Sequence, residues 1–509
     1  MRHGARLSVA LIILTLAAGA AAAMEIRQIG VDASASDSGV VLSLSAPAGA
    51  ESLVLEAFHG QEGISSLFSY QLDLVSASTA SISASDLLGR EIGISVTMPG
   101  GQTRYFHGIC NRFSQGERTR YQAEIVPRLW LLTRTRSTRI FQEMSVPDIL
   151  ATVLRETPGL AFTMQLQGTF HPRTYVVQYQ ESDFAFLSRL MEEEGIFYFF
   201  RHSAGGHTMV LANTPEGHPD LAGAFPYRCA ALDRPDTIAD WDKIQEIRSG
   251  KTTLRDHEFE LPGQTLEVSA DIQDTVAAGQ VLHRLTAGGA DALKLYDYPG
   301  GYAKRFDGID PGGAEGPDEL TKIFEDGRRT VGIRMQEEAA QALVIRGVST
   351  AAIFTPGHRF QLTRHFDGDG AYVLTSVQHS ARAATDGSKG EYRNRFECIP
   401  AGLPFRPARK TPRPVVPGTQ TAVVVGPPGE EIFTDKYGRV KVQFHWDREG
   451  RRDESSSCWV RVGALYAGTE TGFVLPRVGW EVVVAFLEGD PDQPIIVGSV
   501  YNPDHLPPR

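Results

Sequence analysis

The chain has 509 residues, of which 42% are hydrophobic and 22% are charged; this is the composition of a folded globular protein and excludes wholesale disorder. At roughly 150 residues per domain, the length predicts about three to four domains. The net charge of −11 argues against a protein whose main partner is the nucleic-acid backbone, and 51 glycines with 29 prolines favour a turn-rich β-structure.

The first 23 residues have the pattern of a secretory signal peptide. Arg2, His3 and Arg6 precede an uncharged run over residues 7–23 that ends in small residues. This run is short for a membrane span, so a permanent anchor is the weaker interpretation. A third interpretation places the true start at Met24, with the upstream segment untranslated.

Residues 40–141 are predicted to form short strands. Residues 68–75 alternate apolar and polar side chains, which is the pattern of a half-buried strand. Shorter apolar runs at 52–56 and 105–109 have strand length, and glycine-rich turns separate them. We therefore expect a barrel or sandwich in this region.

Two helices are predicted next. Ser145 can cap a helix that Gly159 ends, and Ser182 can cap a second helix that Gly195 ends. Each helix has one apolar face, which indicates packing against a core rather than a ligand site. Residues 196–200 are aromatic-rich and predict a strand directly after the second helix.

A second β-rich region extends over residues 227–397. Strands are predicted at 259–261, 371–377 and 392–398, and the Gly- and Asp-rich segment 307–316 is predicted to be a surface loop. Together with the first region, this pattern indicates two β-barrels in tandem, separated by helices.

Residues 400–417 contain six prolines, which predicts an extended, semi-rigid connector between domains. The basic side chains within it are expected to be solvated, although they could instead meet an acidic surface. These side chains are Arg406, Arg409, Lys410 and Arg413.

The last 80 or so residues, 423–501, predict a compact all-β unit. Residues 439–444 alternate cleanly, and 459–462, 480–486 and 495–500 continue the strand pattern. Five strand-length runs in this length favour a small closed barrel such as an OB-fold.

No enzymatic motif stands out in the sequence. It lacks a Gly-x-Ser-x-Gly elbow, a P-loop, a His-Glu-x-x-His pair and a strand-linked Gly-x-Gly-x-x-Gly. The glutamates at 192–194 are expected to be a solvated helix face rather than catalytic carboxylates, and His445 to belong to a strand-end cluster. The charged segment 447–454 mixes both signs, which favours a polar hairpin over a nucleic-acid site. We therefore predict no enzyme, and no catalytic, cofactor-binding or metal-binding residues.

The four cysteines are far apart and form no Cys-x-x-Cys pair. They are expected to be separate buried side chains, with a structural zinc site or a disulfide framework as the alternatives. These residues are Cys110, Cys229, Cys398 and Cys458.

Several long motifs resemble those of VgrG proteins, the spike proteins of bacterial type VI secretion systems. The longest is EEIFTDKYGRVKVQFHWD at 430–447, and the resemblance covers residues 53–502. Further motifs follow at 457–461, 476–479 and 486–492, and the N-terminal half contributes 140–142, 146–149, 178–184 and 193–198.

This resemblance implies a mainly β fold: tandem barrel domains like those of a phage tail hub, with a few α-helices, followed by a small OB-like barrel. The implied domains are a leader or untranslated segment at 1–23, a hub-like region at 24–399, a linker at 400–417, the OB-like spike base at 418–505, and a tail at 506–509 without the family's β-helical needle.

The resemblance also implies a structural role and its partners. We expect a homotrimer on the Hcp tube protein that helps to puncture target membranes and to deliver effectors, with effectors or adaptors as partners and only transient membrane contact. The missing needle argues against the tip-capping PAAR protein, and neither nucleic acid nor a cofactor is expected. Secretion through the type VI machinery from the cytoplasm is expected, with periplasmic export as the alternative.

Two alternative functions remain. The chain could be a truncated or degenerate adaptor that docks effectors without firing. It could also be a spike enzyme that degrades cell-wall glycan, although the OB-like unit leaves no room for an inserted lysozyme domain.

Overall fold

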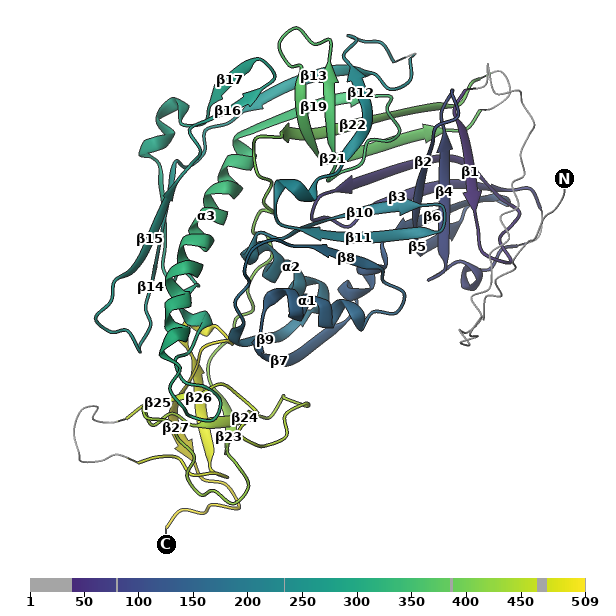
Figure 1. Ribbon diagram of the computed structural model, residues 1–509. Coiled ribbons are helices and arrows are strands. Elements are labelled where there is room, and N and C mark those ends of the chain that lie inside the picture. The colour runs from purple at the N-terminus through teal and green to yellow at the C-terminus, as the bar shows by residue number, and fades with distance from the viewer. Residues whose placement is uncertain (1–38, 79–80, 233, 385–387, 465–473, 509) are drawn as a thin grey trace, which may run out of the picture. The chain divides into compact units, whose positions relative to one another are not determined.

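The computed structural model describes residues 39–509 apart from five gaps (Figure 1). The residues outside the description are 1–38, 79–80, 233, 385–387, 465–473 and 509. The predicted leader at 1–23 therefore lies outside the described residues, and its interpretations stay predictions.

The largest described sheet has 12 strands, and its first six build the N-terminal barrel. In β4, the side chains of Ile92, Ile94 and Val96 are buried in a common core and their neighbours are not, as the alternating sequence requires. The strands predicted at 52–56, 68–75 and 105–109 are confirmed. The six strands are β1 (Val41–Ser45), β2 (Leu53–Gly63), β3 (Ser69–Ser76), β4 (Glu91–Thr97), β5 (Thr103–Gln115) and β6 (Arg120–Val126).

Both predicted helices are present with their predicted serine N-caps, but the first ends at Arg155 with Glu156 as its C-cap, before the predicted Gly159. The hydroxyl oxygens of Ser145 and Ser182 accept backbone N–H groups in the first turn of α1 and α2, and Gly195 ends α2 in the left-handed region at φ 65°. The elements here are β7 (Arg136–Met144), α1 (Val146–Arg155), β8 (Phe162–Gln165), β9 (Arg173–Ser182), α2 (Asp183–Glu194), β10 (Phe197–Ser203) and β11 (Gly206–Ala212).

The second barrel continues the same sheet. β2 pairs antiparallel with β21, from Ala57 opposite Arg382 to Gly63 opposite Ser376, so one backbone ladder runs from the first barrel into the second. A separate hydrophobic core fills the second barrel. Its strands are β12 (Asp220–Pro226), β13 (Ile238–Gln245), β19 (Leu343–Ser349), β20 (Arg359–Thr363), β21 (Gly370–Arg382) and β22 (Glu391–Pro400).

A helix that the sequence patterns did not reveal packs against a small sheet beside the second barrel. This helix is α3 (Lys322–Ala342), and it has no side-chain cap and carries glycines in its interior, which lowers its helix propensity. Tertiary packing accounts for it, since Gly327 lies directly against the ring of Tyr302. The small sheets contain β14 (Lys251–Asp256), β15 (Leu266–Asp271), β16 (Thr275–Ala278), β17 (Val281–Arg284) and β18 (Lys294–Asp297).

The strand predicted at 259–261 is wrong. These residues form a turn between β14 and β15, because tertiary contacts override their local preference. The ring of Phe259 lies under the guanidinium groups of Arg439 and Arg461, and the Glu260 carboxylate accepts the N–H of Gly308.

The C-terminal barrel is a five-stranded sheet in the order β24-β23-β26-β27-β25, as predicted. Val440, Val442 and Phe444 point into its core, which also contains Tyr175 and Val177 of β9. The barrel is therefore packed on β9. Its strands are β23 (Gln420–Val425), β24 (Lys441–Phe444), β25 (Arg461–Val462), β26 (Glu481–Phe486) and β27 (Pro494–Val500).

Short 3₁₀ helices complete the described elements, and no described helix has the length and apolar character needed to cross a membrane. The 3₁₀ helices are η1 (Ala84–Asp86), η2 (Arg128–Thr133), η3 (Pro215–Gly217), η4 (Ala287–Ala292), η5 (Ala303–Arg305), η6 (Pro317–Thr321) and η7 (Leu487–Gly489).

The cysteines are free thiols, and their predicted burial holds in part. Cys110 and Cys398 are buried and Cys458 is half-buried, but Cys229 is exposed, so the prediction is wrong there. Burial raises the pKa of the Cys458 thiol to about 12.

A buried polar network lies where the two barrels and β10 meet. The carboxylate of Glu62 on β2 accepts hydrogen bonds from Arg104 at 3.1 Å and from His379 at 2.9 Å. His202 lies 3.7 Å from the same carboxylate, and its Nδ1 accepts the backbone N–H of His107 at 3.1 Å. One buried carboxylate thus anchors side chains from several strands.

The histidines of this network are held neutral. Burial lowers the pKa of His202 and His379. His207, whose Nδ1 lies 3.3 Å from Nδ1 of His107, extends the network, and burial lowers its pKa to about 3. Burial by itself raises the pKa of Glu62, but the charge of Arg104 and the histidine hydrogen bonds outweigh it and hold that pKa well below its usual range. At neutral pH the network therefore contains one ion pair and uncharged imidazoles.

We predict that acid destabilises the protein through these histidines. Because their pKa is lower in the folded state, the unfolded chain binds more protons below pH 6.5, and stability falls as the pH drops from there toward the folded pKa. His207→Gln should reduce the slope of the unfolding free energy against pH by about 1.4 kcal/mol per pH unit, because the variant lacks one group that takes up a proton on unfolding. Urea unfolding between pH 6.5 and 4.5 measures this slope. Exposed His445→Gln should leave it unchanged, and an unaltered slope in H207Q would contradict the assignment.

Candidate functional site

The glutamates at the end of α2 are not the solvated face that the sequence suggested. Glu193 and Glu194 are only 7% and 4% exposed, and both carboxylates lie inside a cluster of arginines. Three consecutive glutamates at a helix C-terminus oppose the helix dipole, so the helix end needs nearby positive charge. That unfavourable placement is a signal in the sequence that could have indicated buried partners, but we expected a solvated face.

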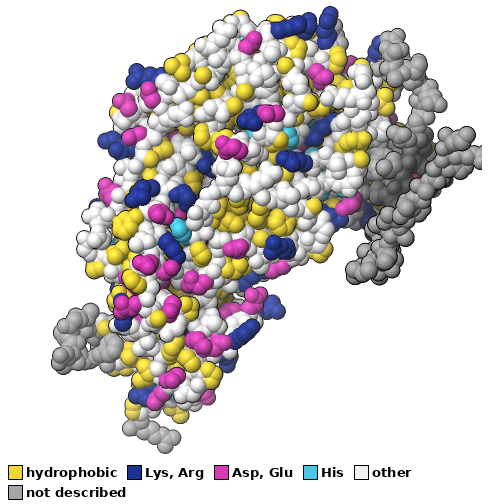
Figure 2. Space-filling model, in the orientation of Figure 1, with side chains coloured by type: hydrophobic (Ala, Val, Ile, Leu, Met, Phe, Trp, Pro, Cys, Tyr) yellow, Lys and Arg dark blue, Asp and Glu magenta, His cyan; other side chains and the backbone are white. Residues whose placement is uncertain are grey.

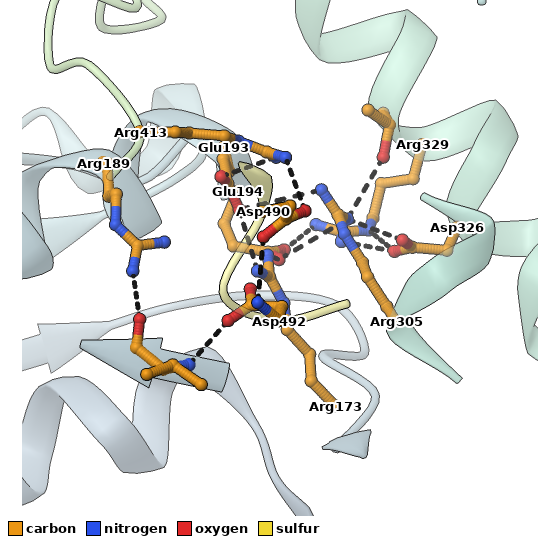
Figure 3. Close-up of polar contacts among 12 residues, drawn as sticks. Arg173, Arg189, Glu193, Glu194, Arg305, Asp326, Arg329, Arg413, Asp490 and Asp492 are labelled. Carbon is orange, nitrogen blue, oxygen red and sulfur yellow. Dashed lines mark hydrogen bonds and ion pairs between the residues drawn. The ribbon is translucent and has the colours of Figure 1, made fainter. Parts of the chain in front are cut away.

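The charge cluster joins α2, α3, η5 and the linker (Figure 3). Arg173 bonds Glu193 at 2.8 Å and also pairs with Glu194. Arg305 pairs with Asp326 at 2.6 Å, and Arg329 contacts both Asp326 and Glu194. Each buried carboxylate therefore meets at least two guanidinium groups, and segments far apart in sequence are tied together by charge.

Burial and charge act in opposite directions on these carboxyl groups. Burial raises the pKa of Glu193, but the guanidinium groups of Arg413 and Arg173 outweigh it and hold the pKa far below its usual range. The pKa values of Glu194 and Asp326 are lowered for the same reason, against their own burial. The cluster therefore stays ionised throughout the physiological pH range.

The arginines of the proline-rich segment contact groups of the same chain, whereas Lys410 is exposed, so the prediction of solvated side chains holds only in part. Arg413 pairs with Glu193 at 2.7 Å, and Arg409 pairs with Glu337 at 3.4 Å. The guanidinium of Arg406 donates to the carbonyl oxygen of Gly195 at 2.8 Å. The acidic surface that the linker meets is thus on the same chain, which makes the linker a strap rather than a free connector.

A loop that was predicted to lie on the surface helps to hold the C-terminal barrel. In 307–316, Asp307 pairs with Arg439 of the barrel at 2.8 Å, and the carbonyl oxygen of Asp310 accepts the indole N–H of Trp459 at 2.9 Å. Arg439 is 3% exposed, so this is a buried contact. The prediction is therefore wrong for the part of the loop that faces the barrel.

The barrel also contacts β9 through the turn after η7. The carboxylate of Asp492 accepts the backbone N–H of Val177 at 2.6 Å, and the guanidinium of Arg189 on α2 donates to the carbonyl oxygen of the same residue at 2.9 Å (Figure 3). The edge of β9 is thereby fixed on both sides, by the barrel and by α2.

The charge cluster, the linker arginines and the contacts of Asp307, Asp310 and Asp492 together connect the C-terminal barrel to the N-terminal region. We call this connection the joint. In the described part of the chain, no group of three or more His, Cys, Asp or Glu side chains is arranged to hold a metal ion. His445, singled out in the sequence, is exposed and contacts Thr421 at 3.1 Å. On the face drawn in Figure 2, acidic and basic side chains are interspersed. The absence of catalytic and cofactor residues stays a prediction.

Comparison with known families matches both parts of the chain. The phage tail baseplate hub (GPD) family matches residues 61–385, which is more than half of the chain. The type VI secretion system/phage-baseplate injector OB domain matches residues 430–501.

Curated relatives are similar over nearly the whole chain. The type VI secretion system spike proteins VgrG1c and VgrG1a of Pseudomonas aeruginosa are each 39% identical over 92% of this chain, which corresponds to 62% and 70% of their own lengths. The actin cross-linking toxin VgrG1 of Vibrio cholerae is 33% identical over 90% of this chain and 41% of its own length. The chain thus spans about three fifths of the length of VgrG1c.

Solved structures share the fold. The E. coli c3393 protein, a type VI secretion component described as similar to the T4 phage tail proteins gp27 and gp5, matches with a TM-score of 0.60 and 21% identity over 90% of this chain and 100% of its own. VgrG in a complex with PdpA from Francisella matches with a TM-score of 0.56 and 8% identity over 91% of this chain and 71% of its own.

We predict that Glu193→Gln loosens the joint. Removing one partner leaves buried arginines uncompensated, which costs about 3–5 kcal/mol. Three of the five tryptophans lie in the C-terminal barrel, so urea unfolding followed by tryptophan fluorescence reports on it. Trypsin should also cut faster at Arg409 and Lys410, because the strap loses its anchor.

Glu319→Gln is the matched control for this experiment. Its carboxylate forms an exposed ion pair with Lys322, so its loss should change the unfolding free energy by about 1 kcal/mol or less. Equal stability and equal trypsin resistance in the two variants would show that the buried cluster does not hold the strap.

Proposed function

Because this chain belongs to the VgrG family of type VI secretion spike proteins, we propose that it is a structural component of such a spike. In this proposal the two barrels form a hub, and the C-terminal barrel forms the base of the spike below it. The observation that carries the proposal is how the barrels are connected. A shared backbone ladder connects the first and second barrels, and a buried charge cluster holds the C-terminal barrel. A part that transmits force needs such rigid connections.

We propose that the working form is a homotrimer. β25 pairs with β27 only at Ile495 and Ile496, so among the described strands the rest of that edge has no partner. Val497 and Tyr501 are 54% and 66% exposed along it. An unpaired edge with exposed apolar side chains is a surface that another copy can cover.

The proposed partners are the Hcp tube protein on the hub side and effectors or adaptors. Support comes from the spike proteins named among the relatives and from the fold shared with VgrG in its complex with PdpA. We do not propose nucleic acid as a partner, because charges of both signs alternate on the drawn face (Figure 2) and the net charge is −11. A PAAR partner is not proposed.

We propose a non-catalytic role. The relative named as an actin cross-linking toxin aligns with this chain over only 41% of its own length, so that activity is not carried over. Release of peptidoglycan fragments by the purified protein would overturn the non-catalytic proposal in favour of the glycan-degrading alternative.

We predict a mass of three times the chain's 55.6 kDa in light scattering, together with binding to the tube protein. Val497→Glu should shift the protein toward monomers, because it places a charge in the proposed contact. Ile247→Glu is the matched control, since Ile247 is 61% exposed on a loop after β13. A wild-type monomer at micromolar concentration that does not bind the tube protein would contradict the spike role. A deletion strain that still secretes the tube protein would favour the adaptor alternative.

We also propose export by the type VI machinery from the cytoplasm, which does not require the signal-like segment 1–23. Deleting residues 1–23 should then leave the amount of secreted protein unchanged in the native host. Immunoblotting of culture medium measures it, and a loss of secretion on deletion would support signal-dependent export to the periplasm instead.

A further inference from the structure

A cavity of about 370 Å³ lies beside the joint, between the C-terminal barrel and the N-terminal region. Tyr175 of β9 and Glu258, in the turn after β14, line it from one side, and Trp459 and Asp492 of the barrel line it from the other. Binding sites for small molecules have volumes of roughly 300–1,000 Å³, so there is room for one small organic group.

Two acidic side chains on the cavity wall lack a positive partner. Glu258 is 7% exposed, and neither it nor Asp492 has a lysine, arginine or histidine nitrogen within 4.0 Å among the described residues. Glu258 accepts the backbone N–H of Glu260 at 3.4 Å, and Asp492 accepts that of Val177 at 2.6 Å. A buried carboxylate without an ion pair is costly, and Glu258 is such a group, whereas Asp492 is half-buried and feels the more distant charges of Arg189 and Arg413.

The pKa values of both carboxyl groups are raised. Burial raises the pKa of Glu258 to about 7, and the negative charges of Glu260 and Asp307 add to this. Burial likewise raises the pKa of Asp492 to about 7, with Asp490 contributing. Near neutral pH both carboxyl groups are thus partly protonated, and a bound cation would favour their ionised forms.

A third group on the wall is also unsatisfied. Tyr175 is only 6% exposed, and its buried hydroxyl has no hydrogen-bond partner among the described residues. The aromatic wall already accepts guanidinium groups, since those of Arg439 and Arg461 lie 5.1 Å and 4.6 Å from the ring centre of Phe259. These features point to a ligand that donates hydrogen bonds and carries positive charge.

Other charged groups face the same space. Glu260, Asp307 and Glu488 add negative charge; His257, Lys304, Arg439 and Arg461 are the basic residues of the lining. Lys304 has no ion pair with any described residue, so its positive charge would repel an entering cation. Because no described group of three or more metal-binding side chains is present, a cation that binds through hydrogen bonds fits better than a metal ion.

We propose that this cavity binds one organic cation, an ammonium or guanidinium group the size of a lysine or arginine side chain, held by Glu258, Asp492 and the Tyr175 hydroxyl. The proposal does not depend on the spike role. Binding transfers the acidic proton of a carboxyl group to the buffer, so charge in the cavity stays balanced.

Calorimetric titration of the full chain with agmatine at pH 7 tests this. We expect one site per chain and a net release of protons, which appears as a difference in heat between phosphate and Tris buffers. 1,4-Butanediol, a neutral ligand of similar length, should not bind. Comparing agmatine with a blocked Gly-Arg-Gly peptide separates a free amine from the side chain of a partner protein, and binding of either supports the proposal.

Glu258→Gln should weaken binding about tenfold, which corresponds to about 1.4 kcal/mol, and should reduce proton release. Its circular dichroism at pH 8 should match the wild type and its melting temperature should be equal or higher, because the substitution removes a buried unpaired charge. Lys304→Ala should strengthen binding, and Glu325→Gln, an exposed carboxylate on α3, should not change it. The proposal is overturned if the wild type binds neither cation at millimolar concentration, or if Glu258→Gln and Glu325→Gln bind equally.

Discussion

Charges buried away from water must be compensated where they lie, and the described structure depends on this requirement more than on any single core. The carboxylates at the end of α2 and the arginines from β9, η5, α3 and the linker neutralise one another. Removing one partner leaves the other buried charges without full neutralisation, so the contributions of these residues to stability are coupled. This explains how a chain with four described hydrophobic cores keeps a fixed connection between them.

The connections differ in kind along the chain. Between the first and second barrels it is backbone hydrogen bonding from β2 to β21, together with the buried network of Glu62, Arg104 and His379. Between the N-terminal region and the C-terminal barrel it is a mixture of apolar packing on β9 and buried ion pairs such as Arg439 with Asp307. The first connection therefore depends on backbone hydrogen bonds and neutral histidines, and the second on apolar packing and ion pairs.

The fold was largely predictable from the sequence, and the joint was not. Apolar and alternating patterns identified ten of the 27 described strands, and Ser145 and Ser182 identified two helices, because these signals are local. Helix α3 and the turn at 259–261 depend on distant residues, namely Tyr302 and Arg439, and no local pattern encodes them. Glu193, Glu194 and Arg413 were visible as charged residues, but charge alone indicates solvent, and only the tertiary structure reveals that each has a partner.

The ladder between β2 and β21 also determines how the molecule would yield under load. Seven residue pairs, from Ala57 with Arg382 to Gly63 with Ser376, lie side by side along the strands. A pull along the strand direction loads all of them at once, so they must shear together. The strap residues Arg406, Arg409 and Arg413 hold by separate contacts that can be peeled away in sequence. Under tension, the C-terminal barrel should therefore detach before the two larger barrels part.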